Sequence, residues 1–142
     1  MTIAAILNGK GREVISIDGA TTVGEAVALL ARRRIGAVPV MEGREVVGVF
    51  SERDVIGCID ASGASALDTP VRQVMTTPAV TVTPDQPVLA ALSLMTRRRI
   101  RHLPVLDGGA MIGFVSIGDL VKHRIDRIES EAAAMRDYIQ GG

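Results

Sequence analysis

The 142-residue sequence contains few of the residues on which many protein functions depend. It has one cysteine, Cys58, two histidines and no tryptophan, and aromatic residues make up 2% of it. A single cysteine excludes an internal disulfide, and two histidines and one cysteine at these positions match no metal-ligand spacing. Sixteen basic residues balance sixteen acidic ones. No overall charge therefore favours nucleic acid or an anionic membrane as a partner.

Long hydrophobic runs are missing as well. No stretch approaches the roughly 20 apolar residues that cross a bilayer. The apolar run Ile3–Leu7 is too short for a signal peptide and lacks its basic flank. Together with the single cysteine, these absences predict a cytoplasmic protein. Since 47% of the sequence is hydrophobic but so little is aromatic, the core must be built from aliphatic residues and methionine.

Arrangements typical of enzymes are also absent from the sequence. The serines that recur in its motifs have no nearby histidine in a nucleophile arrangement. The segment Gly9-Lys10-Gly11 lacks the spacing of a phosphate-binding P-loop. The sequence therefore predicts a protein that is not an enzyme and uses no catalytic cofactor.

An internal repeat is the main feature that the sequence does contain. Shifting the chain by 65 residues places Val14–Val55 on Ala79–Leu120 without a gap. The two segments share an arginine triplet followed by isoleucine, a Pro-Val pair, two glycines and a Ser-x-x-Asp motif. Solenoid arrays need three or more units, so two copies predict a pseudo-twofold pair with two related clefts.

Each copy has the residue pattern of strand, helix, strand, strand, helix. Apolar residues at helical spacing predict the helices Val23–Arg34 and Val88–Arg99. Asp85 is a candidate cap for the second of these. A further helix is predicted over Leu120–Ile139, after the second copy. Runs of β-branched and apolar residues, some separated by glycine turns, predict the strands Val14–Ile17, Ala37–Met41, Val46–Phe50, Ala79–Val82, Leu103–Leu106 and Met111–Val115.

The repeated motifs resemble those of the cystathionine-β-synthase-type (CBS) domain. The first copy carries Ile35–Val40 and Gly48–Asp54, and the second carries Ile100–Val105 and Gly113–Asp119. Two such units in tandem resemble the pair called a Bateman module. The resemblance implies an α/β (α+β) fold in which two pseudo-twofold-related β-α-β-β-α units pack sheet to sheet, with a C-terminal helix added. It divides the chain into unit 1 (6–56), a linker (57–70), unit 2 (71–122) and a C-terminal helix (123–142).

The Ser-x-x-Asp motifs admit two interpretations. Ser51 and Ser116 each precede a predicted helix N-terminus, where free N–H groups favour an anion. Asp54 and Asp119 could accept hydrogen bonds from the hydroxyls of a ribose. Alternatively, each Ser-Asp pair forms a capping box that satisfies the helix end. Gly48, which precedes the first motif, would let another backbone or a ligand come close to its strand.

The resemblance implies adenine nucleotides as regulatory ligands: AMP, ADP or ATP, with NAD and S-adenosylmethionine as alternatives. It also implies that each cleft combines segments of both copies. The first cleft would be lined by Val49, Ser51, Arg53, Asp54, Ala79, Val80, Ile100, Arg101, His102 and Pro104. The second would be lined by Phe114, Ser116, Gly118, Asp119, Val14, Ile15, Ile35, Gly36, Ala37 and Pro39.

The two predicted clefts differ in charge. The first contains Arg53, Arg101 and His102, which can donate to phosphate oxygens. The equivalent positions of the second are glycine or alanine. A phosphorylated nucleotide should therefore prefer the first cleft. The arginine triplets end the predicted helices, where the helix dipole favours cations, and they are interpreted as a solvated face from which one member could reach a phosphate.

These observations predict a stand-alone regulatory or sensor module that signals to a protein partner. A homodimer is expected, because the helices are unlikely to hide all their apolar residues in so small a unit. The helix Leu120–Ile139 could add a helix–helix contact. The alternative is a non-catalytic interaction or scaffold dimer with vestigial clefts. Nucleic-acid binding has only the arginine runs in its favour and no stacking aromatics.

Overall fold

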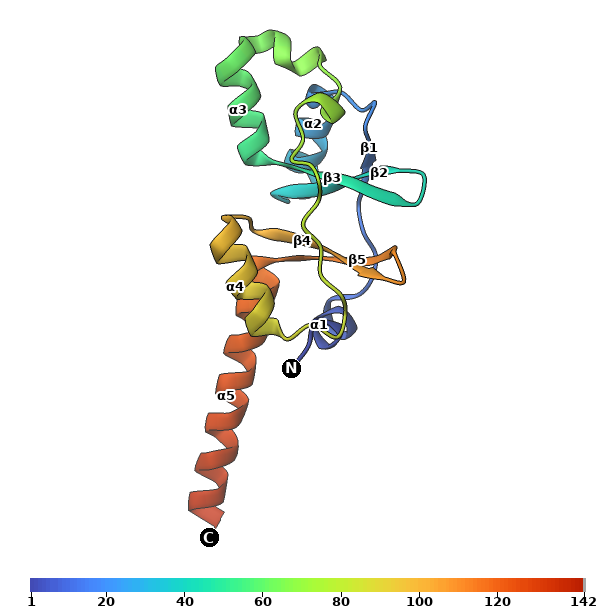
Figure 1. Ribbon diagram of the computed structural model, residues 1–142. Coiled ribbons are helices and arrows are strands. Elements are labelled where there is room, and N and C mark those ends of the chain that lie inside the picture. Colours follow the sequence, from blue (N-terminus) through green and yellow to red (C-terminus); the bar gives the residue numbers. More distant parts are fainter. Residues whose placement is uncertain (142) are drawn as a thin grey trace.

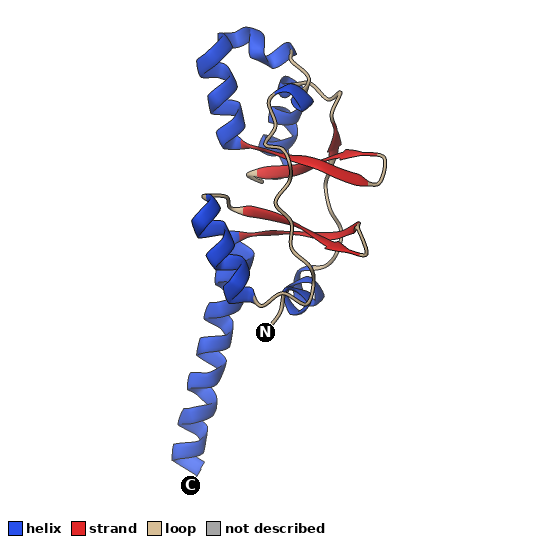
Figure 2. Ribbon diagram, viewed as in Figure 1, coloured by secondary structure: helices blue, strands red, loops and turns tan. Residues whose placement is uncertain are grey.

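Two small β-sheets face one another across the middle of the computed structural model, and helices cover their outer sides (Figures 1 and 2). The structure describes residues 1–141. Each repeat supplies one sheet with its covering helices, and one cluster of buried, mainly aliphatic residues is centred on each repeat. The fully buried Phe50 is an aromatic exception to the expected aliphatic core. The predicted fold, two related units packed sheet to sheet with a C-terminal helix, is confirmed.

The first sheet contains β1 (Ile17–Asp18), β2 (Ala37–Glu42) and β3 (Glu45–Ser51) in the order β1-β2-β3. β2 and β3 form an antiparallel hairpin, and β1 runs parallel to β2. The predicted strand Val14–Ile17 is wrong in its extent, because only Ile17 of that run pairs with β2. Val14 and Ile15 instead line a cavity described below.

The second sheet consists of β4 (His102–Asp107) and β5 (Ala110–Ser116), an antiparallel hairpin. The predicted strand Ala79–Val82 is also wrong in its extent. Only Val82 bridges to β4: its N–H donates to the Pro104 carbonyl at 3.1 Å, and its own carbonyl accepts from the Leu106 N–H at 2.8 Å. In both repeats, then, a short apolar run is held by one or two backbone contacts rather than by a full ladder.

The central helix of each repeat ends in the same unusual conformation. α2 (Val23–Arg33) is capped by Thr22, whose Oγ1 accepts from the Glu25 N–H. α4 (Val88–Arg98) has Pro87 at its N-cap and no side-chain cap, so the predicted Asp85 cap is wrong. Both helices end at an arginine in the left-handed region, with φ of 55° at Arg34 and at Arg99.

The remaining helices complete the two units. α3 (Glu52–Ser62) follows β3 and leads into the 3-10 turns η1 (Gly63–Asp68) and η2 (Val71–Gln73). α5 (Ile117–Gly141) follows β5 and is one continuous helix of 25 residues. The predicted boundary between unit 2 and a C-terminal helix, at residues 122 and 123, falls inside it. No helix within residues 1–141 is both long and apolar enough to cross a membrane.

The N-terminal helix α1 (Ile3–Lys10) packs on the second repeat (Figure 1). Its buried residues Ile3, Ile6 and Leu7 join the cluster formed by the second repeat. At Gly113 on β5, an added Cβ would lie 2.5 Å from the Leu7 Cδ2 atom. A larger residue at this position would displace the Leu7 side chain, which shows how closely α1 packs on β5. The N-terminal helix is thereby attached to the second repeat.

The segment that begins unit 2 makes a similar close approach to the first sheet. The Val49 N–H donates to the Thr76 carbonyl at 3.0 Å, and the Thr76 N–H donates back at 3.0 Å. A Cβ at Gly48 would lie 2.8 Å from the Thr76 carbonyl oxygen. The prediction that Gly48 admits another backbone is confirmed, and the contact places the beginning of the second repeat beside β3.

Candidate functional site

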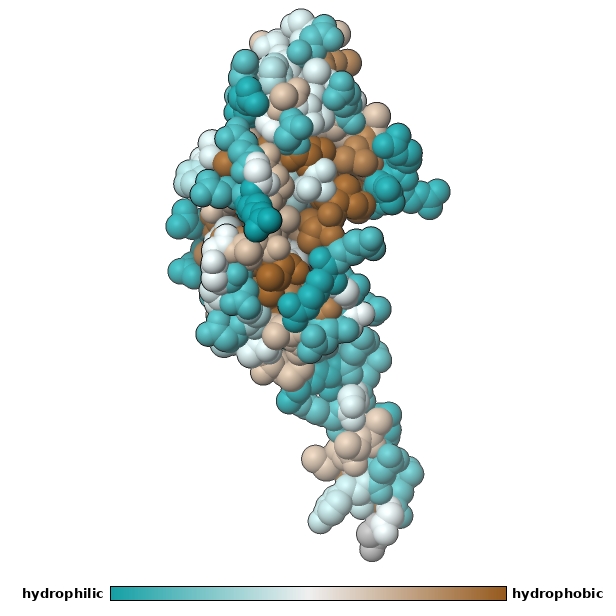
Figure 3. All heavy atoms as spheres, turned by 90° about the vertical axis from the view of Figure 1, so that its right-hand side faces the viewer, coloured by the Kyte–Doolittle hydropathy of each residue, from teal (hydrophilic) through white to brown (hydrophobic). Residues whose placement is uncertain are grey.

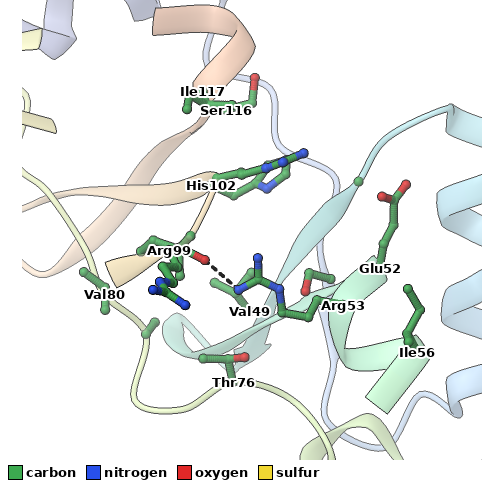
Figure 4. Close-up of a pocket in the computed structure, with 15 residues that line it drawn as sticks. Val49, Glu52, Arg53, Ile56, Thr76, Val80, Arg99, His102, Ser116 and Ile117 are labelled. Atoms are coloured by element: carbon green, nitrogen blue, oxygen red, sulfur yellow. Dashed lines mark hydrogen bonds between the residues drawn. The ribbon is translucent and has the colours of Figure 1, made fainter. Parts of the chain in front are cut away.

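A cavity of about 530 Å³ lies between the two repeats, where the end of β3 and the start of α3 face the segment before β4 (Figure 4). Most of the residues predicted for the first cleft line it: Val49, Ser51, Arg53, Ala79, Val80, Ile100, Arg101 and His102. Asp54 and Pro104 were predicted to line it and do not. The combination of segments from both copies is therefore as expected, although the carboxylate proposed for the ribose lies outside the lining.

The position of Asp54 follows from its capping role. Ser51 and Asp54 form a reciprocal capping box at the start of α3. The Asp54 carboxylate accepts from the Ser51 N–H at 2.9 Å and from the Thr76 hydroxyl at 3.0 Å. At the start of α5, the Ser116 N–H donates to Asp119 Oδ2 at 2.8 Å, and the Asp119 N–H donates to Ser116 Oγ at 3.1 Å, so the reciprocal capping contacts recur there. The capping interpretation is confirmed for both motifs, and a contact with ribose stays a prediction.

Arginines from both repeats line the first cavity. The Arg53 Nη1 atom donates to the Arg99 carbonyl oxygen at 2.7 Å, so the first repeat holds the end of α4 (Figure 4). Arg99 and Arg101 add two more exposed guanidinium groups to the lining, and Glu52 is its one acidic residue. The cavity therefore presents an excess of positive charge beside apolar walls. This combination suits a ligand with both a flat apolar part and an anionic part.

Sequence reasoning missed several residues of this lining. They are Gly36, Glu52, Ile56, Thr76, Arg99, Ser116 and Ile117. The sequence did contain a signal for Arg99. The last arginine of each triplet directly precedes a segment, from isoleucine to proline, that was assigned to a cleft. Arg34, its counterpart, lines the second cavity. In each triplet one member thus reaches a cleft, as the alternative interpretation of the arginine runs allowed.

The second cavity has a volume of about 360 Å³ and contains most of the residues predicted for it. These are Val14, Ile15, Ile35, Gly36, Ala37, Phe114, Ser116 and Asp119. Gly118 and Pro39 were predicted to line it and do not. In Figure 3, apolar side chains gather on the face shown at about the level between the two sheets, and hydrophilic side chains border them.

One cation in the second cavity, Lys10, was not foreseen. The Lys10 Nζ atom lies 2.6 Å from Asp119 Oδ2 and donates to the Phe114 carbonyl at 2.6 Å. Arg34 and Glu13 also line this cavity. The argument that only the first cleft offers charged donors is therefore wrong. Lys10 belongs to α1, which has no counterpart in the second repeat, so comparing the two copies could not reveal it.

The Lys10 contact also changes the acidity of Asp119. Partial burial by itself raises the pKa of this carboxyl group. The hydrogen bonds from Lys10 and from Ser116, together with the charge of Lys10, outweigh burial and hold the pKa of Asp119 below its ordinary value. Asp119 is therefore a carboxylate that already has a cationic partner, unlike Asp54.

His102 separates the two cavities and lines both. Its ring stacks on Phe114, with the centroids 5.5 Å apart and the planes 16° from parallel. Gly36 faces it: a Cβ there would lie 3.4 Å from the His102 Cε1 atom. Burial is the main cause that lowers the pKa of His102, and the nearby charge of Lys10 adds to it. The imidazole is thus a neutral, half-buried partition between the two cavities near pH 7.

Comparisons with known proteins agree with this architecture. A family model described as the CBS domain matches residues 11–61 and 71–126. The mitochondrial CBS domain-containing protein CBSX3 of Arabidopsis thaliana is 37% identical over 153 residues, covering 99% of this chain and 73% of that protein. The crystal structure of a CBS-domain-containing protein from Agrobacterium tumefaciens has a TM-score of 0.85 and 34% identity, covering 87% of this chain and 99% of that one. A CBS-domain protein from Pyrobaculum aerophilum, solved in complex with AMP, has a TM-score of 0.73 and 28% identity, covering 84% and 89%.

Proposed function

This chain belongs to the CBS-domain family, and on that premise we propose that it is a regulatory module that binds an adenine nucleotide in its first cavity. AMP is the leading candidate, because a relative of similar fold was solved with AMP. The module would act without catalysis: the ligand changes how the two repeats, or two copies of the chain, are arranged. A partner protein then responds to that arrangement.

The observation that carries this proposal is the pairing of apolar walls with guanidinium groups in the first cavity. Val49, Val80 and Ile100 suit the faces of an adenine ring, which packs well on branched aliphatic side chains. Arg53, Arg99 and Arg101 would face the phosphate. The Ser51 hydroxyl lies within the lining, but it already donates to Asp54 Oδ2 at 3.1 Å and accepts from the Asp54 N–H at 3.4 Å. A ribose hydroxyl would have to donate to the second lone pair of the Ser51 oxygen or displace one of these bonds.

The second cavity is proposed as the weaker site. It is smaller, and the Lys10 ammonium group already pairs with Asp119 at 2.6 Å. A phosphate entering there would compete with this carboxylate for Lys10 and would meet the acidic Glu13 in the lining. The preference of a phosphorylated nucleotide for the first cavity thus stays a prediction, now based on competition within the second cavity.

Calorimetry with AMP and adenosine tests the proposal. Arg101→Ala should weaken AMP binding about tenfold, since one charge-assisted hydrogen bond contributes roughly 1.5 kcal/mol. Adenosine binding should change little, because adenosine carries no phosphate. Arg97→Ala is the matched control: it removes an exposed arginine of α4 that does not line the cavity. Equal AMP affinity in both variants would overturn the assignment of AMP to the first cavity. No AMP binding at millimolar concentration would overturn the proposal as a whole and favour a scaffold with vestigial clefts.

A further inference from the structure

The free part of α5 carries an exposed apolar stripe. Leu120 is the buried residue of this helix, and the chain then extends away from both sheets to Gly141 (Figure 1). Along this free part, large apolar side chains are between 42% and 79% exposed. On the side visible in Figure 3, the same segment is mainly hydrophilic. A helix of this length with one apolar stripe needs another surface to cover that stripe.

The stripe has the spacing of a coiled-coil seam. Its members alternate at steps of four and three residues, an average of about 3.5, which is the heptad period. Consecutive residues in this series occupy alternating d and a positions of a heptad. They are Val121, Ile125, Ile128, Ala132, Met135 and Ile139. The series stays in phase from end to end, so one continuous seam runs along about 28 Å of helix.

Charges beside the seam indicate what partner it fits. Arg124 and Glu131 occupy g positions, whereas Glu129 and Arg136 occupy e positions. In a parallel pair of helices, a g residue faces the e residue of the following heptad on the other helix. Arg124 would then face Glu129 of a second copy, and Glu131 would face Arg136. Both pairs have opposite charges, and the twofold symmetry of a homodimer forms each of them twice.

An antiparallel pair of α5 helices would instead bring like charges together. In the register that keeps every apolar layer, Val121 would lie opposite Ile139 of the second copy. Residues e then face e and residues g face g, so Glu129 would meet Glu129 and Glu131 would meet Glu131. Lys122 would meet Arg136 in the same register. Every one of these contacts joins like charges, which disfavours this orientation.

We propose that α5 forms a parallel two-stranded coiled coil with α5 of a second copy over residues 121–139. Glu131 Oε1 also forms an ion pair with the Arg127 Nε atom on its own helix, at 3.1 Å, and its second carboxylate oxygen can accept from the other copy. The twofold axis would run along the helices, so both modules lie at the same end of the coil. The inference specifies the surface of the predicted homodimer and does not depend on nucleotide binding.

Disulfide trapping tests the orientation in the full chain. In a Cys58→Ser background, Met135→Cys should form a disulfide-linked dimer under mild oxidation, because a parallel seam brings residue 135 next to residue 135 of the other copy. The antiparallel register separates these two residues by about 15 Å along the axis, beyond the roughly 7 Å between Cα atoms that a disulfide tolerates. Ser130→Cys, at the outer f position of the same helix, is the matched control and should not cross-link.

Charge reversal with light scattering tests the pairing independently. Arg124→Glu should weaken dimerisation about tenfold, because it turns two attractive contacts per dimer into repulsive ones. The double variant Arg124→Glu/Glu129→Arg should restore the original dissociation constant. A dimer in solution that fails to cross-link at residue 135 would overturn this inference and leave a homodimer built on another surface. Equal cross-linking of the Ser130→Cys control would likewise overturn the coiled coil. A monomer at micromolar concentration would overturn both the coiled coil and the homodimer.

Discussion

Replacing Arg99 with glycine should stabilise the fold and weaken ligand binding at the same time. Arg99 ends α4 with φ of 55° and ψ of 42°. A left-handed conformation costs a residue with a Cβ roughly 1–2 kcal/mol, whereas glycine adopts it without strain. Glycine also gives the unfolded chain more conformational freedom, which offsets about 0.5–1 kcal/mol of this gain. The difference predicts that Arg99→Gly raises the free energy of unfolding by about 0.5–1 kcal/mol.

Contacts of the side chain do not alter this expectation. Arg99 is exposed, and its hydrogen bond with Arg53 uses the backbone carbonyl, which glycine retains. Arg34 offers a second test, since it is exposed and ends α2 with the same φ of 55°. Arg34→Gly should stabilise the protein by a similar amount.

Two neighbouring arginines provide matched controls. Arg33 and Arg98 are exposed and lie within the last turns of α2 and α4. Glycine there should lower the free energy of unfolding by up to about 1 kcal/mol, because it weakens a regular helix. Urea unfolding of the four variants measures the differences. If Arg99→Gly destabilises the protein as much as Arg98→Gly does, the argument from backbone strain is refuted.

Ligand binding should distinguish Arg99→Gly from Arg34→Gly. Arg99 lines the first cavity and Arg34 the second. Arg99→Gly should therefore reduce the affinity for AMP, while Arg34→Gly should leave the affinity of the first cavity unchanged. Calorimetry with AMP measures both. A strained residue is retained at many functional sites because its side chain is needed there, and this pair tests whether that applies here.

Three further changes have definite expected outcomes. Gly48→Ala should lower the free energy of unfolding by about 1–3 kcal/mol in urea titrations, because its Cβ would lie 2.8 Å from the Thr76 carbonyl oxygen. His102→Asn should reduce the loss of stability between pH 7.5 and 5.5. Because the pKa of His102 is lowered in the folded protein, the contribution of this residue to stability is present above the ordinary histidine pKa of about 6.5 and is lost as the pH falls. Lys10→Met should destabilise the protein by up to about 1 kcal/mol at pH 7, and the difference from wild type should shrink below about pH 4, since the lowered pKa of Asp119 makes its contribution disappear as the carboxylate is protonated.

Much of the architecture could be predicted because its signals are local or repeated. Runs of β-branched and apolar residues separated by glycine turns located both hairpins, and helical spacing located α2 and α4 to within one residue. The resemblance to paired CBS units, carried over to the repeated motifs, indicated which segments combine to line each cavity. The same comparison could not choose between ribose binding and capping for Asp54, because both require a carboxylate three residues after a serine.

The sequence by itself determined the duplication and the two hairpins, and its resemblance to CBS units indicated many of the residues that line the two cavities. Only the tertiary structure decided that α1 packs on the second repeat, where Lys10 reaches Asp119 across 109 positions of the chain. It also decided that His102 lines both cavities and that Val14 and Ile15 line a cavity instead of extending β1. Periodicity and capping report on neighbours within a few residues, whereas these contacts depend on how separate elements pack together. No local pattern, and no comparison between two copies, carries that information for a helix that occurs only once.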